Sequence, residues 1–187
     1  MKDNSIIKNK ILVVDDTETN IEIVMEFLNN KYDVLVALDG KTAIEIANEE
    51  DIDLILLDIL MPVMDGFEVC SILKNNTATK NIPIIFITTQ TDDEFIQKAF
   101  EMGGGDYIKK PFRPIELLSR INNHLNSKKY QEILISENLH TKTNLQNLKT
   151  HVIKKSSSSQ LENNKLINEY KLEINFLNEI LSTYKKN

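Results

Sequence analysis

The sequence predicts an α/β fold in which strands and helices alternate around an open parallel sheet. Short apolar runs alternate five times with helix-like stretches along the first two thirds of the chain. Strands that alternate with helices of this length indicate βαβ units and a parallel sheet. Runs such as LILL (54–57) and IPIIFI (82–87) are almost continuously apolar, as expected for strands buried on both faces. Several runs also end in residues capable of chemistry, which places those residues at one edge of the sheet.

The order of the elements follows from this alternation. The strands are expected at residues 10–15, 33–37, 53–58, 83–88 and 105–109. The helices are expected at residues 18–29, 41–50, 65–75, 92–102 and 113–126. Glycines separate the elements at Gly40, Gly66 and Gly103 to Gly105, where turns and helix borders need them.

The segment after Asn126 has a different composition. It contains no Gly or Pro and is rich in Asn, Lys, Leu and Ile, which favours helix although Asn is a weak helix former. Four serines at 156–159 interrupt it, and Ser159 followed by Glu162 matches a capping box, so a new helix should begin near Gln160. We therefore expect a helical linker at 127–155 and a separate heptad helix within 156–187.

Both parts of this tail have a heptad seam. The seam of the last helix consists of Ile167, Tyr170, Ile174, Leu177, Leu181 and Tyr184. A weaker seam precedes the serines, with two polar members, and consists of Leu134, Asn138, Thr141, Leu145, Leu148 and Val152. An isolated helix of this length is marginal in water, so it needs a partner. A second chain would give a coiled-coil dimer and the preceding segment would give a hairpin. The stronger second seam favours the dimer.

Composition and charge exclude several classes of protein. Residues 1–126 contain 12 Lys and Arg against 22 Asp and Glu, whereas residues 127–187 contain 10 against 6. An acidic first part argues against DNA binding, and no helix-turn-helix candidate follows residue 126. One Cys excludes an internal disulfide and fits a reducing cytoplasm. No apolar stretch approaches the roughly 20 residues of a membrane span, and the polar N-terminus does not resemble a signal peptide.

Five polar residues follow the apolar runs: Asp15, Asp16, Asp58, Thr88 and Lys110. They should converge at the carboxyl edge of the sheet. Three neighbouring carboxylates cannot all stay ionised without a cation, and a hard ion with oxygen ligands, such as Mg²⁺, suits them. A metal-loaded carboxylate beside a Lys and a Thr indicates a site for a phosphoryl group.

The three His residues and Cys70 form no metal motif, and Cys70 is expected in the core.

These motifs resemble the receiver domain of bacterial two-component response regulators. The resemblance covers residues 8–126 and includes the acidic pair, LLDILMPVMDGFEV (56–69), Thr88 and DYIKKPF (106–112). It implies a flavodoxin-like (βα)5 doubly wound sheet with strand order 2-1-3-4-5, followed here by the helical tail.

The resemblance also implies a role for each site residue. Asp58 would be the phosphoacceptor, and Lys110 would contact a phosphoryl oxygen. Asp16, Asp58 and the backbone carbonyl of Leu60 would bind Mg²⁺ directly, while Asp15 would act through water. The family's Lys precedes a cis proline, as Lys110 precedes Pro111, and strand alternation places the rival Lys109 on the opposite face.

Thr88 and Tyr107 would form the switch of such a domain. Thr88 would bond the phosphoryl group and Tyr107 would then turn inward. Two features depart from the usual pattern. Thr89 replaces a small residue and should narrow access to the site, and the glycine triplet replaces an Ala and an Asp, which suggests a mobile loop.

The expected function is therefore a phosphorylation-controlled switch rather than an enzyme. A sensor histidine kinase would phosphorylate Asp58, and the tail would control dimerisation or a partner helix, without DNA or membrane binding. Alternatively, the chain is the sensory half of a larger protein with a nucleotide cyclase, phosphatase or kinase output. An Asp-nucleophile phosphatase of the haloacid dehalogenase type is disfavoured, because its Asp-x-Asp pair is absent. His151 lacks the following acidic residue of a kinase phosphoacceptor.

Overall fold

Five parallel strands form one sheet in the order β2-β1-β3-β4-β5, as the resemblance implies. The computed structural model describes residues 8–89, 93–156 and 163–184. The strands are β1 (Lys10–Val14), β2 (Asp33–Ala37), β3 (Leu54–Asp58), β4 (Ile84–Thr88) and β5 (Asp106–Lys109). They fall within the ranges that the apolar runs predict.

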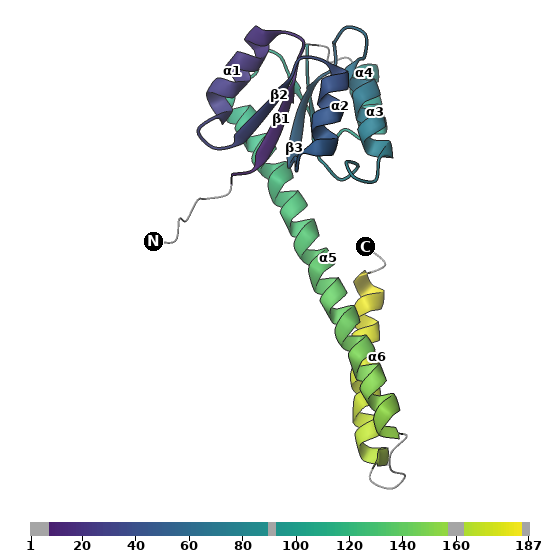
Figure 1. Ribbon diagram of the computed structural model, residues 1–187. Helices are drawn as coiled ribbons and strands as arrows, with labels where there is room; N and C mark the ends of the chain where they lie inside the picture. The colour runs from purple at the N-terminus through teal and green to yellow at the C-terminus, as the bar shows by residue number, and fades with distance from the viewer. Residues whose placement is uncertain (1–7, 90–92, 157–162, 185–187) are drawn as a thin grey trace. The chain divides into compact units, whose positions relative to one another are not determined.

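The helices cover both faces of the sheet. They are α1 (Glu18–Leu28), α2 (Gly40–Glu49), α3 (Gly66–Asn75), α4 (Asp93–Glu101), α5 (Pro114–Ser156) and α6 (Asn163–Tyr184). Alternate residues of each strand enter two separate cores. Leu12 of β1 packs with apolar residues of α2, α3 and α4, whereas Ile11 packs with those of α1 and the start of α5. Figure 1 shows α2, α3 and α4 grouped on one side of the sheet. The doubly wound fold is confirmed.

The chain divides into two units, Met1–Lys128 and Lys129–Asn187. The helix expected at 113–126 and the expected linker are one continuous helix, α5, which begins in the first unit and supplies the second. Among the described residues, no helix has the length and hydropathy needed to cross a membrane.

In the second unit, α6 lies beside the last part of α5 (Figure 1). The His151 and Tyr170 rings meet edge to face, with their centroids 6.3 Å apart. On the α5 seam Leu145 is buried and Leu148 is half-buried, and on the α6 seam Ile174 and Leu177 are half-buried. The seams thus face each other within one chain, as the hairpin alternative expects, and a homodimer stays a prediction. The side chains of Val152, Ile167, Leu181 and Tyr184, and the expected cap at Ser159 and Glu162, lie outside the described residues.

Candidate functional site

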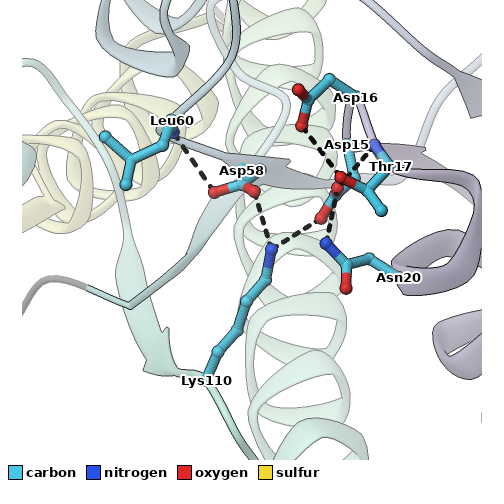
Figure 2. A network of polar contacts seen from close by, with 7 residues as sticks. All are labelled: Asp15, Asp16, Thr17, Asn20, Asp58, Leu60 and Lys110. Atoms are coloured by element: carbon cyan, nitrogen blue, oxygen red, sulfur yellow. Dashed lines mark hydrogen bonds and ion pairs between the residues drawn. The ribbon is translucent and has the colours of Figure 1, made fainter.

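The parallel sheet brings the predicted site residues to one edge. Asp15 and Asp16 directly follow β1, Asp58 ends β3, and Lys110 follows β5. Figure 2 shows their side chains pointing toward one another. One ligand oxygen of each of the three carboxylates lies within 4.8 Å of the others. Asp15 and Asp58 are buried, whereas Asp16 is exposed and open to an incoming ligand.

Lys110 connects two of these acids. Its ammonium lies 2.6 Å from Asp15 Oδ2 and 2.7 Å from Asp58 Oδ2. Its backbone N–H donates to the Thr88 carbonyl at 2.8 Å, and the Lys110–Pro111 peptide is cis. Lys109 is exposed. The choice of Lys110 over Lys109, and the cis peptide, are therefore as expected.

Burial and charge act against each other in this cluster. Burial raises the pKa of Asp58 and the Asp15 carboxylate adds to this effect, against the opposing hydrogen bond from Lys110. Burial alone would lower the pKa of Lys110, but its hydrogen bonds to Asp15 and Asp58 outweigh burial and raise it. Lys110 therefore stays charged and compensates one of the three carboxylates.

The remaining charge makes the cluster suitable for a divalent cation. Three carboxylates and one ammonium leave two uncompensated negative charges close together. Such a group is stabilised by an opposite charge, and an all-oxygen donor set is the chemistry that Mg²⁺ prefers. The Leu60 carbonyl is the third direct ligand expected, beside Asp16 and Asp58. Leu60 follows Asp58 closely, and its N–H donates to Asp58 Oδ1 at 3.3 Å.

Sequence reasoning missed Asn20 as a member of this network. Its side-chain amide donates to Asp15 Oδ1 at 2.9 Å, and the same oxygen accepts the Thr17 N–H at 3.0 Å. Asn20 lies in the first turn of α1, four positions after Asp16. That placement in a helix directly after the acidic pair is the signal that could have identified it.

The acids lie in a cleft of about 510 Å³. Its polar wall includes Asp15, Asp16, Asn20, Asp58 and Lys110, and its apolar wall is formed by Val13, Val14, Ile23, Val24, Ile87, Pro111 and Phe112. Thr89 is exposed and also lines the cleft. The narrowing of access by its β-branched side chain stays a prediction.

The two expected switch residues lie on neighbouring strands. Thr88 ends β4 and is 2% exposed. Tyr107 on β5 is half-buried and packs against the core on the α2–α4 side of the sheet. In the β4–β5 ladder, Tyr107 pairs with Phe86 and Thr88 pairs with Lys109. Thr88 is therefore joined to β5 by directly paired backbone.

Two glycines of the motifs are explained by close packing. A Cβ at Gly66 would lie 2.3 Å from the Asp58 carbonyl oxygen, so only glycine lets α3 begin against the loop after Asp58. A Cβ at Gly104 would lie 2.3 Å from the Phe86 ring. Gly104 is buried and its N–H donates to Ala99 O at 3.0 Å. Gly104 therefore fills a space too small for a side chain, and the mobility expected for the glycine triplet stays a prediction.

The chain belongs to the response regulator receiver family, whose domain model matches residues 11–122. A Vibrio cholerae protein named "Probable cyclic di-GMP phosphodiesterase" is 41% identical over 133 residues, which cover 71% of this chain and 30% of that protein. The response regulator PleD of Caulobacter vibrioides is 38% identical over 115 residues, covering 61% and 25%. The DNA-binding response regulator MtrA of Mycobacterium tuberculosis is 37% identical over 119 residues, covering 63% and 51%.

Solved structures give the same result for the fold. Chemotaxis protein CheY4 of Vibrio cholerae matches with a TM-score of 0.60 and 33% identity, over 62% of this chain and 98% of that one. Response regulator DrrB of Thermotoga maritima matches with a TM-score of 0.58 and 33% identity, over 65% and 54%. The chain is thus a two-component response regulator with the acidic site typical of receiver domains. It spans only a quarter to about half of the curated relatives named above.

Proposed function

We propose that this protein is a phosphorylation switch in which Asp58 accepts a phosphoryl group from a sensor histidine kinase. The observation that supports this most directly is the geometry around Asp58. Its carboxylate lies in an open cleft, one oxygen bound by the Lys110 ammonium at 2.7 Å, with two further acids close by. A structural carboxylate at a strand end would need neither the additional acids nor the cleft.

The proposed reaction uses the Asp58 carboxylate as a nucleophile. One of its oxygens forms a bond to phosphorus. The bond from phosphorus to the donor's nitrogen or oxygen breaks, and its electron pair leaves with the donor. Lys110 holds a phosphoryl oxygen as a point charge. Asp15, Asp16, Asp58 and the Leu60 carbonyl would hold Mg²⁺, which when bound offsets the negative charge of the phosphoryl group.

Phosphorylation by acetyl phosphate with Mg²⁺ tests the assignment. The intact chain should gain the mass of one phosphoryl group, and Asp58→Asn should gain none because an amide is not a comparable nucleophile. Asp51→Asn, an exposed acid at the opposite end of β3, is the matched control and should be phosphorylated normally. Undiminished labelling of Asp58→Asn, or a label that maps to His151, would contradict the proposal.

Thr88 and Tyr107 are proposed to read the phosphoryl group. The Thr88 hydroxyl would donate to a phosphoryl oxygen, and Tyr107 would then move inward. Thr88→Ala should accept phosphate but should not show the changes in the NMR spectrum of β4, α4 and β5 that beryllofluoride with Mg²⁺ produces in the wild type. A variant that cannot be phosphorylated would assign Thr88 to the chemistry instead.

The output is proposed to act through the tail in the cytoplasm, as a homodimer or by contact with a partner helix. Several large apolar side chains of the second unit are exposed, including Leu139 at 64%, Leu172 at 71% and Phe176 at 62%. Exposed apolar surface of this kind marks interaction sites. Sedimentation with and without beryllofluoride tests the dimer. A chain that stays monomeric in both states, at all concentrations, would leave the partner helix as the output.

A second candidate is the sensory part of a larger receiver–linker–effector protein. The relatives that match are two to four times longer than the matched segment, and one is named as a cyclic di-GMP phosphodiesterase. The mass of the natural gene product decides between the two. An effector module, such as a nucleotide cyclase, phosphatase or kinase, would appear as additional mass. We propose no enzymatic turnover for the residues present beyond gain and loss of the chain's own phosphate.

A further inference from the structure

The carboxylate of Asp15 is held more completely than that of either neighbouring acid. Oδ2 accepts from Lys110 at 2.6 Å, while Oδ1 accepts from the Thr17 N–H at 3.0 Å and from Asn20 Nδ2 at 2.9 Å. Asp15 is 5% exposed. Three donors thus fix both oxygens of a buried carboxylate, whereas Asp16 is exposed and makes one long contact with Thr17 Oγ1 at 3.4 Å.

We propose that Asn20 is a positioning residue for the magnesium site, which sets the orientation of the Asp15 carboxylate from the first turn of α1. The inference rests on the proposed function, because it takes Asp15 to act on Mg²⁺ through water. A carboxylate that binds a metal ion through water can hold that water in place only if its own oxygens keep one orientation. The Thr17 donor is a backbone N–H, which does not depend on the side chain at position 17. Asn20 is the residue whose side chain donates to Asp15 Oδ1 (Figure 2).

A purely helical role does not explain an asparagine at this position. The backbone N–H of Asn20 already bonds to Thr17 O at 3.0 Å, so the helix start does not need the side chain. Asparagine is a weaker helix former than alanine. The half-buried amide also lines the cleft rather than the helix surface. Its contact with Asp15 is therefore the feature that distinguishes it from a better helix former.

The test compares Asn20→Leu, which keeps the shape without the donor, with Asn20→Ala. The control is Thr19→Ala, an exposed neighbour in the same turn. Mg²⁺ affinity is measured by calorimetry, and the Mg²⁺ dependence of phosphorylation by acetyl phosphate is measured in parallel. Unfolding temperatures are recorded without Mg²⁺, as a check on the fold that does not involve the metal.

Loss of a side chain that orients a metal ligand typically weakens metal affinity about 10-fold or more. Both Asn20 variants should therefore need about tenfold more Mg²⁺ for half-maximal phosphorylation, by the same reasoning. The rate at saturating Mg²⁺ and the unfolding temperature without Mg²⁺ should stay at the wild-type values. Thr19→Ala should match the wild type in every measurement.

Three results would overturn the inference. Wild-type Mg²⁺ affinity in both Asn20 variants would remove the positioning role. A lower unfolding temperature without Mg²⁺ in both variants would make the role structural. A lower rate at saturating Mg²⁺ with unchanged affinity would place Asn20 on the phosphoryl group itself. A wild-type protein that binds no Mg²⁺ and accepts no phosphoryl group would instead contradict the proposed function, which separates the two failures.

Discussion

The two units of this chain bury their apolar residues in different ways. In the receiver unit, a sheet covered on both faces gives complete burial, and residues such as Leu12, Leu56 and Phe86 are 0% exposed. In the second unit, Leu145 at 6% is the one apolar side chain described as buried, while Leu172 and Phe176 stay largely exposed. Two helices share one seam, so each leaves most of its circumference to solvent.

The two units are therefore suited to different roles. The receiver unit holds Asp15, Asp58 and Lys110 on rigid strand ends, which a reaction at a fixed geometry requires. The second unit provides exposed apolar surface, which suits the proposed association with another helix. Substitutions in both units can test this division and the packing on which the receiver unit depends.

Two aspartates introduced into the tail seam should unfold the second unit and leave the first unit folded. Ile174→Asp with Leu177→Asp places two carboxylates on the half-buried seam of α6, where an unpaired charge is strongly unfavourable. We expect circular dichroism to show loss of helix, with phosphorylation of Asp58 unchanged. Asn175→Asp, on the exposed face, is the control. If the double variant is no longer phosphorylated, the two units are not independent.

Deletion of a buried leucine should cost more in the receiver unit than in the tail. Leu12→Ala removes a 0% exposed side chain from a closed core and should lower the free energy of unfolding by about 2–5 kcal/mol. Leu145→Ala should lower it by less than half as much, because a single seam collapses or hydrates more easily than a closed core. Urea unfolding followed by circular dichroism measures both. Equal losses would refute the difference between the units.

Gly104→Ala tests the close packing of β4 against the glycine triplet. The added Cβ would meet the Phe86 ring at 2.3 Å and the Ala99 carbonyl oxygen at 2.8 Å, and overpacking of this kind costs roughly 1–3 kcal/mol. At Gly105 the nearest atom would be His124 Cε1 at 3.0 Å, the end of a side chain that can move. Gly105→Ala should therefore destabilise less in thermal unfolding. Adding Phe86→Leu to Gly104→Ala should cost less than the sum of the two single changes.

Asp53 should stabilise the receiver unit in a pH-dependent manner at the point where α5 leaves it. Its carboxylate accepts from the Lys10 N–H at 2.9 Å and from Lys128 Nζ at 3.2 Å. Burial would raise the pKa of Asp53, but these hydrogen bonds outweigh burial and lower it below 3.8. A carboxyl whose folded pKa is lowered adds stability above its unfolded pKa and loses it as the pH falls through the folded value.

Asp53→Asn should therefore lower the free energy of unfolding at pH 7 by about 1 kcal/mol. This value is kept small because the ion pair of Asp53 with Lys128 is partly exposed to solvent. The difference from the wild type should disappear on acidification below the ordinary pKa of Asp. Urea unfolding at both pH values measures it, with Asp51→Asn as the exposed control. A deficit that persists unchanged in acid would show that shape, rather than charge, is lost.

Residue order alone was enough to predict the five strands, the first four helices and the acidic residues of the site. Strands could be placed because apolar runs and the glycines that end them are local patterns in the sequence. The rule that parallel strands end at one edge then grouped Asp15, Asp58 and Lys110. The motif order identified the receiver domain and distinguished Lys110 from Lys109. Heptad spacing also identified seam positions that are shielded in the tail, including the buried Leu145 and the half-buried Ile174.

The contacts between these residues follow only from the way the chain packs. Both tail seams could pair within a chain or between chains, because heptad spacing describes one face of a helix and not its partner. The Asn20 contact with Asp15 depends on how α1 leaves β1, and the need for glycine at position 104, in the loop before β5, depends on Phe86 of β4. Such contacts join residues through packing, and local periodicity contains no information about the distance between them.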